Sequence, residues 1–281
     1  MSASLTRPRH KRVLPGFGIS LGTSLFFVSL ILLLPASGLV VQTSQMTWAE
    51  YWHVIADPRV VASYKVTVGA ALIASLFNGL LGLLLAWVLV RYDFYGKRML
   101  DGLVDLPFAL PTAVAGITLA TLYSTSGWIG SVLNDFGIKV AYTPLGIVLA
   151  MAFTSLPFVV RTVQPVLEEI SQEEEEAGMT LGASDLAVFW RVILPSLRPA
   201  LLVGIALSFT RSLGEFGAVI FIAGNMPYTS EITSLMIFVR LQEFDFPAAS
   251  AIASVVLLAS LALLLLINLW QGAYLRRIHG R

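Results

Sequence analysis

Six long apolar stretches, separated by polar connections, are the feature that most restricts how this chain can fold. They cover residues 19–41, 66–90, 106–123, 145–160, 201–222 and 248–270. A helix needs roughly 20 apolar residues to cross the hydrocarbon core of a bilayer. Only 12% of the residues are charged, whereas soluble domains carry about a quarter. The sequence therefore predicts an all-α integral membrane protein with six transmembrane helices.

Two of the six stretches are short, and both contain proline. Pro107 and Pro111 lie in stretch 106–123, and Pro144 and Pro157 bound or interrupt stretch 145–160. Broken helices are tolerated in a membrane where neighbouring helices or water satisfy the freed backbone groups. The first stretch follows a basic segment, as in a signal peptide, but it is longer than the apolar region of about 7–15 residues in such peptides. It is expected to be a retained span.

The basic residues predict the orientation of the chain. Taking alternate connections, thirteen lie on the side of the two termini: Arg7, Arg9, Lys11, Arg12, Arg91, Lys97, Arg98, Arg161, Arg191, Arg198, Arg276, Arg277 and Arg281. Four lie on the opposite side: Arg59, Lys65, Lys139 and Arg240. Lys and Arg are enriched in cytoplasmic loops. The tails 1–18 and 271–281 are therefore expected in the cytoplasm. The six-span transmembrane domain is expected at 19–270, and it includes a cytoplasmic loop at 168–199.

Several kinds of chemistry are excluded. The chain has no cysteine, and its three histidines are scattered at His10, His53 and His279, so no metal-binding spacing occurs. No G-x-x-x-x-G-K-[ST] motif is present, so the chain has no P-loop of its own. The net charge of +1 does not indicate a nucleic-acid partner. We expect no catalytic residue, metal or cofactor.

The polar segment 168–199 is predicted to form a helix, a turn and a second helix. Acidic residues crowd the first half, where carboxylates complement the positive end of a helix dipole. Gly182 is suited to stop that helix, because glycine adopts a left-handed conformation without steric cost. Ser184 is suited to cap the second helix, and Pro195 is expected to end it.

The same segment resembles the E-A-A-x-x-x-G loop of bacterial ABC importer permeases, which docks on a separate ATPase subunit. Gly178 stands where that motif has its second alanine, and Val192 replaces an isoleucine. The resemblance implies six residues that couple the chain to the ATPase: Glu176, Ala177, Gly178, Gly182, Leu194 and Pro195. The alternative is an acidic amphipathic hairpin on the membrane surface, but anionic headgroups would repel its carboxylates.

A polar stripe crosses the fifth apolar stretch. Ser208, Arg211, Ser212 and Glu215 recur at helical spacing and are expected on one helix face. An arginine inside a membrane faces a cavity or a partner, because its exposure to lipid is costly. Two interpretations stay open: these residues line a translocation path for an anion, or Arg211 and Glu215 form a structural pair. Two glycines beside the carboxylate are predicted to serve a gate, through flexibility or close packing: Gly214 and Gly217.

Longer stretches extend the resemblance over nearly the whole chain, among them LPFALPTAVAG at 106–116 and LSFTRSLGEFGAVIFIAGN at 207–225. They are similar to the sulfate/thiosulfate ABC importer permeases. The resemblance implies a type I importer fold in the bacterial inner membrane, where lipid surrounds the spans. It also implies a heterodimer with a second, related permease, two cytoplasmic ATPase subunits and a periplasmic sulfate/thiosulfate-binding protein.

Other functions remain as alternatives. A molybdate or tungstate permease would handle dianions of similar charge and geometry. An ion-coupled secondary anion transporter would show inverted repeats, and no clear repeat relates the two halves. A membrane enzyme built on Arg211, Glu215 and Asn225 would need a nucleophile with a base, or a metal cluster, and none accompanies them.

Overall fold

The computed structural model describes residues 17–279, and every regular element within this range is helical. The predicted N-terminal tail lies almost entirely outside the described residues, together with its basic residues Arg7, Arg9, Lys11 and Arg12, and so does Arg281. The elements in chain order, including two π-helical turns, are α1 (Phe17–Val28), η1 (Ser29–Leu33), α2 (Leu34–Thr43), α3 (Trp48–Ile55), α4 (Pro58–Arg91), α5 (Lys97–Val104), α6 (Leu106–Ala109), α7 (Thr112–Tyr123), α8 (Trp128–Asp135), α9 (Pro144–Glu169), α10 (Gln172–Thr180), α11 (Asp185–Val188), η2 (Phe189–Ile193), α12 (Leu194–Leu213), α13 (Val219–Ile222), α14 (Thr233–Gln242) and α15 (Phe246–His279).

Within residues 17–279, five helical stretches are long and apolar enough to cross a membrane. They are Phe17–Thr43, Pro58–Arg91, Pro144–Glu169, Asp185–Leu213 and Phe246–Ile267. The remaining predicted span, 106–123, is divided into α6 and α7, and α7 has only 12 residues. Twelve residues extend about 18 Å, which is less than the thickness of the hydrocarbon core of about 30 Å. The break falls at Leu110, which is extended because the ring of Pro111 disfavours a helical conformation before it.

The fifth apolar stretch also differs from its predicted range of 201–222. Its helix is continuous from Asp185 and ends at Leu213, and the short helix α13 follows after a turn. In that turn the Glu215 carboxylate accepts a hydrogen bond from the backbone N–H of Ala218, at 3.0 Å. The Glu215 side chain thus takes the place of a backbone carbonyl as hydrogen-bond acceptor where the helix is interrupted.

The prediction that Pro195 ends the helix is wrong. The π-helical turn η2 ends at Ile193, two residues before Pro195, and the N–H of Leu194 bonds to the carbonyl of Phe189, five residues back. A proline lacks an N–H and its ring crowds the carbonyl four residues back. The wider turn accommodates both defects, so the helix continues into α12. The first span repeats this solution, with η1 directly before the α2 residue Pro35.

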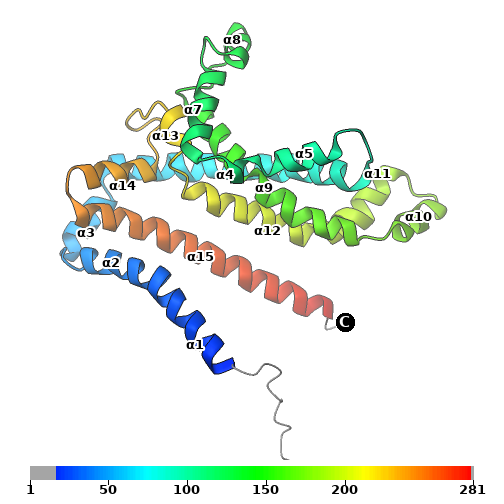
Figure 1. Cartoon of the computed structure of the whole chain (residues 1–281), viewed down its shortest axis with the longest axis horizontal. Helices are drawn as coiled ribbons and strands as arrows, with labels where there is room; N and C mark the ends of the chain where they lie inside the picture. The colour runs from blue at the N-terminus through cyan, green and yellow to red at the C-terminus, as the bar shows by residue number, and fades with distance from the viewer. Residues whose placement is uncertain (1–16, 280–281) are drawn as a thin grey trace, which may run out of the picture.

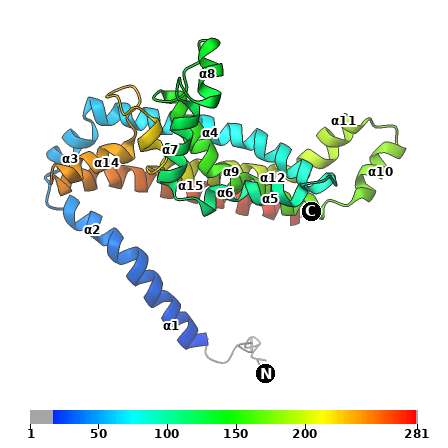
Figure 2. The ribbon, with the colours of Figure 1, turned by 45° about the horizontal axis from the view of Figure 1, so that its top comes forward.

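Three long helices, α4, α9 and α12, form the centre of the bundle and run along its long axis (Figures 1 and 2). Small residues let them approach closely. A Cβ atom on Gly79 would lie 2.7 Å from the side chain of Ile205, and one on Gly82 would lie 2.7 Å from Val159. Gly204 of α12 would meet the backbone of Val159 at 3.0 Å. The small residues of α4 therefore serve packing within this chain, which in lipid depends on such close contact.

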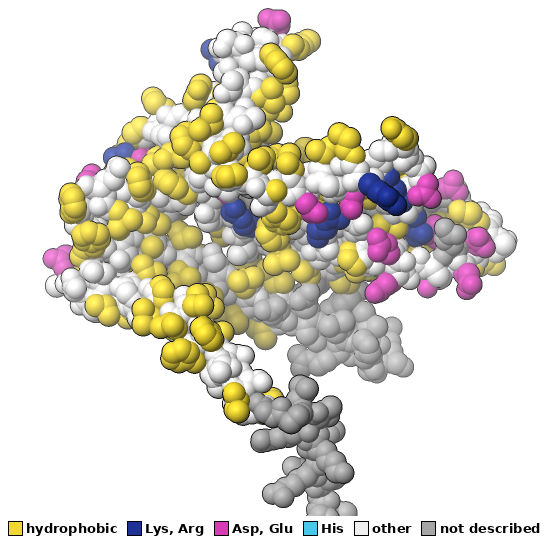
Figure 3. Space-filling view, viewed as in Figure 1, with side chains coloured by type: hydrophobic (Ala, Val, Ile, Leu, Met, Phe, Trp, Pro, Cys, Tyr) yellow, Lys and Arg dark blue, Asp and Glu magenta, His cyan; other side chains and the backbone are white. Residues whose placement is uncertain are grey.

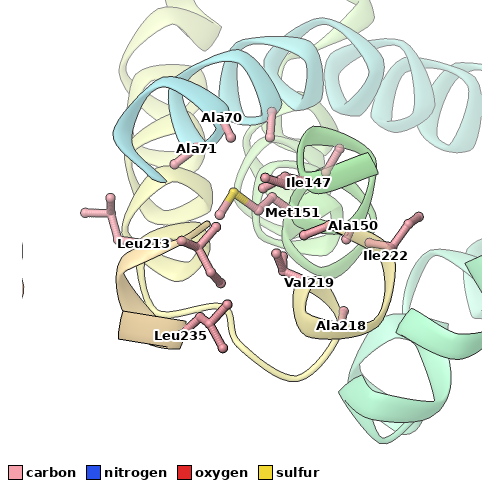
Figure 4. Packing of buried hydrophobic residues seen from close by; sticks show 14 of the residues in the cluster. Ala70, Ala71, Ile147, Ala150, Met151, Leu213, Ala218, Val219, Ile222 and Leu235 are labelled. Carbon is pink, nitrogen blue, oxygen red and sulfur yellow. The ribbon is translucent and has the colours of Figure 1, made fainter. Parts of the chain in front are cut away.

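The buried cluster at one end of the bundle joins α4 and α9 to the chain after residue 213. Figure 4 shows Met151 and Ile147 of α9 beside Ala70 and Ala71 of α4, with Val219 on the opposite side. All five side chains are buried. The backbone of α7 also contacts this region at Ala218. A Cβ atom on Gly116 would lie 2.3 Å from the carbonyl oxygen of Ala218.

The first helical stretch stands apart from this core. It comprises α1, η1 and α2, none of which contains a buried residue. Only α2 packs beside α15, whereas α1 diverges from the bundle (Figures 1 and 2). α7 and α8 project from the side of the molecule in both views. These elements leave large apolar surfaces uncovered by the chain itself.

The close contact at Gly116 predicts a large effect of a single methyl group. We expect Gly116→Ala to lower the free energy of unfolding by about 1–3 kcal/mol, because the added carbon collides with backbone that cannot rotate away. Gly102→Ala is the matched control, since a Cβ there meets nothing within 4 Å. Thermal unfolding of the detergent-solubilised protein measures both. A Gly116→Ala variant as stable as Gly102→Ala would contradict the packing described for α7.

Candidate functional site

The helix–turn–helix expected in segment 168–199 is present at one end of the bundle. α10 is followed by Gly182, which has a φ of 84°, and the Ser184 hydroxyl accepts a hydrogen bond from the N–H of Ala187 at 3.4 Å. A Cβ on Gly178 would lie 3.2 Å from Val188, so the absence of a side chain there brings α10 and α11 together. Both the stop and the cap predicted from the sequence are confirmed.

An ion pair between Arg91 and Glu175 joins α10 to the end of α4. Both side chains are largely buried, and the Arg91 guanidinium also lies over the ring of Trp87, 5.7 Å from its centroid. The sequence analysis missed this contact. Four consecutive glutamates occur at 173–176, and sequence periodicity does not reveal which of them turns toward a residue more than 80 positions earlier.

The outer surface of this segment combines charged and apolar side chains. Glu176 and Ala177 are exposed, as are Leu181, at 89%, and Leu186, at 68%. Figure 3 shows Asp, Glu, Lys and Arg side chains gathered at the end of the molecule that carries α10 and α11. At the same end, a hydrogen bond from Lys97 lowers the pKa of the exposed Asp93 carboxyl.

The six candidate coupling residues separate into two groups. Glu176, Ala177 and Gly182 lie on the exposed tip, and Gly178 is half-buried where α10 meets α11. Leu194 and Pro195 are also half-buried and belong to the start of α12, beyond the π-helical turn. The tip residues are therefore available for contact, whereas the last two determine how the segment continues into the bundle.

The polar stripe does not form one surface. Ser208 and Ser212 are fully buried and take part in a hydrogen-bond network in the bundle centre. Their hydroxyl groups lie 2.9 and 3.1 Å from that of Ser155, and the Asn78 amide lies 2.9 Å from the same oxygen. The network joins α4, α9 and α12. In this structure these two serines therefore connect helices of this chain.

Arg211 and Glu215 form an ion pair of 2.7 Å. The glutamate side chain is 1% exposed, whereas that of the arginine is 34% exposed. The pair anticipated as a structural possibility is thus present. About a third of the arginine side chain nevertheless remains accessible at a place where the neighbouring serines are buried.

The two candidate hinge glycines have different surroundings. A Cβ on Gly217 would lie 2.1 Å from the Thr112 hydroxyl oxygen, so close packing against α7 explains this glycine. Gly214 has a single neighbour at 4.0 Å and is not constrained by contact. Close packing therefore accounts for Gly217 only.

Asn225, which the enzyme alternative grouped with Arg211 and Glu215, serves a turn. It has a φ of 52°, and its amide donates to the carbonyl of Ile220 at 2.9 Å. In the part of the chain that the structure describes, no group of three or more His, Cys, Asp or Glu residues could hold a metal ion.

A second buried carboxylate, Glu231, lies at the end of the bundle away from α10 and α11. The Arg59 guanidinium holds Glu231 through two hydrogen bonds of 2.7 and 2.8 Å, and Glu231 is buried. This pair connects the first turn of α4 to the segment before α14. It was not predicted, because 172 residues separate the partners.

The bundle of long helices with an exposed helix–turn–helix at one end has the same fold as solved membrane proteins. A bacterial alginate ABC transporter, solved in complex with an alginate pentasaccharide-bound periplasmic protein, shares the fold with a TM-score of 0.74 over 89% of this chain and 92% of that chain, at 17% identity. An amino acid ABC transporter solved with histidines has a TM-score of 0.54 over 81% of this chain and all of that chain, at 18% identity.

Sequence comparison identifies the family. Residues 78–280 match the model of the binding-protein-dependent transport system inner membrane component, and the chain belongs to this family. It is 67% identical to the sulfate transport system permease protein CysT of Salmonella typhimurium over 270 residues, which cover 96% of this chain and 98% of the relative. CysT of Escherichia coli strain K12 is 66% identical with the same coverage. CysT of Synechocystis is 49% identical over 88% of this chain and 87% of the relative.

The chain is therefore a multi-pass membrane permease of an ABC importer and not an enzyme. Its family works with a binding protein, and ATP hydrolysis belongs to a separate subunit. The resemblance noted from the sequence is confirmed at the level of family and of fold.

The Arg91 contact predicts how firmly α10 is held. We expect Glu175→Gln to increase cleavage of segment 171–190 by chymotrypsin severalfold, because the charged partner of Arg91 is lost. Glu174→Gln is the control, since Glu174 is exposed on the same helix. Cleavage rates of the purified permease in detergent give the comparison. Equal rates in the two variants would show that the ion pair does not hold the segment.

Proposed function

We propose that this chain is a permease subunit through which a bacterial ABC importer moves sulfate and thiosulfate across the inner membrane. The observation that carries this proposal is the identity of 66–67% with two CysT sulfate permeases over 96% of the chain. The molybdate alternative has no comparable support. The oxyanion enters from a periplasmic binding protein, and ATP supplies the energy.

We assign the tip of segment 168–199 to docking on the ATPase subunit. Exposed Glu176, Ala177 and Leu181 offer a surface with charged and apolar parts, and the Arg91–Glu175 pair ties that surface to α4. A movement of the ATPase subunit would then displace the tip and the long helices together, as one rigid body. This assignment places the segment and both termini in the cytoplasm, in accord with the basic residues.

Chymotrypsin should cleave segment 171–190 in inside-out vesicles and spare it in intact cells.

A heterodimer with a related permease and two ATPase subunits completes the proposed assembly. The uncovered apolar surfaces of α1, α7 and α8 are compatible with a second membrane subunit. In the proposed cycle, ATP binding closes the ATPase subunits and opens the permease cavity toward the periplasm. Hydrolysis returns the cavity to the cytoplasmic side and releases the anion.

Arg211 is the residue that we assign to the anion path. Its side chain is 34% exposed, whereas the buried Glu215 carboxylate lies 2.7 Å from its guanidinium. A cation lowers the electrostatic barrier to an anion, and the adjacent carboxylate weakens that attraction. Weak attraction suits a transporter, because a permeating ion must leave as readily as it enters.

Uptake of radiolabelled sulfate tests the proposed function. The chain would be expressed with its partner subunits in cells that lack their own sulfate permeases, and unlabelled thiosulfate or molybdate would be added as competitor. We expect ATP-dependent uptake that thiosulfate suppresses. Suppression by low concentrations of molybdate alone would show that the cargo is wrong, even though the chain is an importer permease.

Replacement of Arg211 tests its place in the path. We expect Arg211→Ala combined with Glu215→Gln, which avoids an unpaired buried carboxylate, to reduce sulfate uptake about tenfold, because the anion loses its attracting charge. Arg240→Ala is the control, since Arg240 forms an ion pair with Glu243 outside the bundle centre, where the Glu243 side chain is 53% exposed. Copurification of the ATPase subunit checks docking. Normal uptake by the double variant would assign the Arg211–Glu215 pair a structural role only.

A further inference from the structure

Arg161 makes the most extensive set of polar contacts of any charged residue in the described part of the chain. Its guanidinium donates to both carboxylate oxygens of Asp105, at 2.9 and 2.6 Å, and to the Asp101 carboxylate at 2.6 Å. It also bonds to the Asp101 carbonyl at 3.0 Å and to the Gln164 side chain at 2.7 Å. A guanidinium has five N–H groups. All five are directed at oxygen atoms of this chain, so Arg161 is not an anion-binding residue.

Arg161 lies in a part of α9 that is weakened by two prolines. Pro157 lies four residues before it and Pro165 four residues after it, both inside the helix. Each proline removes one backbone hydrogen bond and favours bending. α9 ends at Glu169, and α10 begins only three residues later at Gln172. A displacement of the proposed docking segment therefore reaches the weakened part of α9 that carries Arg161.

The two aspartate partners of Arg161 lie outside α9. Asp101 lies in α5, and Asp105 lies directly before α6. Phe108 of α6 reinforces the connection through an edge-on contact with Phe158 of α9, at 5.3 Å between ring centroids. α5 and α6 thus have polar and aromatic contacts with the same two turns of α9.

Beyond α6, the chain leads to the Arg211–Glu215 pair. Leu110 and Pro111 form the short connection from α6 to α7, with Leu110 in an extended conformation. α7 in turn packs on the turn that follows Glu215, where Gly116 contacts Ala218 and Thr112 contacts Gly217. The same turn holds the Glu215 carboxylate through the Ala218 N–H.

We propose that Arg161 is a positioning residue that links movement of the docking segment to α6, α7 and the surroundings of Arg211. The proposal rests on the transport function proposed above. Without the guanidinium, α9 would bend between its two prolines while α5 and α6 stay behind. ATP hydrolysis would then continue with fewer anions moved per ATP. The link works in both directions, as the free-energy coupling between two sites requires.

The test measures sulfate uptake and ATP hydrolysis together, in proteoliposomes that contain the complete importer with its binding protein. We expect Arg161→Gln to lower the number of sulfate ions imported per ATP about tenfold. Asp105→Asn, which weakens the two-oxygen contact, should lower it more than Asp101→Asn. Asp93→Asn is the control, because it removes an exposed ion pair with Lys97 close to the same end of the molecule. Arg161→Lys, which keeps the charge but not the five donors, should restore part of the ratio.

Each outcome decides the proposal. A reduced import-to-ATP ratio in a complex that assembles normally, in the expected order of variants, would support it. An unchanged ratio in Arg161→Gln and Asp105→Asn would overturn it. Loss of all these variants from the membrane, Asp101→Asn included, would also overturn it in favour of a purely structural role. Absence of sulfate uptake by the unmodified importer would instead contradict the proposed cargo, and the binding-protein-stimulated ATPase rate of the variants would then decide the link.

Discussion

The interior of a bilayer provides no water for an unpaired backbone N–H or carbonyl group, and the whole architecture depends on this constraint. Long helices satisfy it along most of the chain. Prolines challenge it. Pro157 and Pro165 of α9 and Pro199 of α12 stay inside an α-helix, whereas three other prolines show two further solutions. At Pro35 and Pro195 a π-helical turn keeps the helix continuous, whereas at Pro111 the helix breaks. Continuity connects the helix–turn–helix of segment 168–199 to the bundle, and the break divides α6 from α7.

Charges and polar groups inside the bundle follow the same constraint. Asn78, Ser155, Ser208 and Ser212 are joined by hydrogen bonds between three helices, and Glu215 is held by Arg211 and by a backbone N–H. Buried polar groups need partners of this kind because their desolvation is otherwise costly. Such contacts also bring together segments that are distant in sequence. The polar interior therefore positions the helices, and only Arg211 among the stripe residues combines burial of its partner with accessibility of its own side chain.

Prediction from the sequence was strongest where local signals suffice. The turn at Gly182 and the cap at Ser184 follow from the properties of these residue types, and the family resemblance followed from short motifs. The stripe shows the limit of the method. Helical spacing placed Ser208, Arg211, Ser212 and Glu215 on one side of a helix, but it contains no information about which neighbours cover that side. The contacts of Arg91, Arg161 and Arg59 were equally invisible, because each joins residues more than 50 positions apart.

The amino-acid sequence by itself determined the class of this protein: apolar runs specify membrane helices, and a short acidic motif specifies an ABC importer permease. Both depend on composition and spacing within a few dozen residues. Only the tertiary structure decided which helices pack together, which glutamate of 173–176 pairs with Arg91 and which polar residues face inward. These outcomes arise from close packing between distant segments, where a single methyl group at Gly82 or Gly116 would not fit.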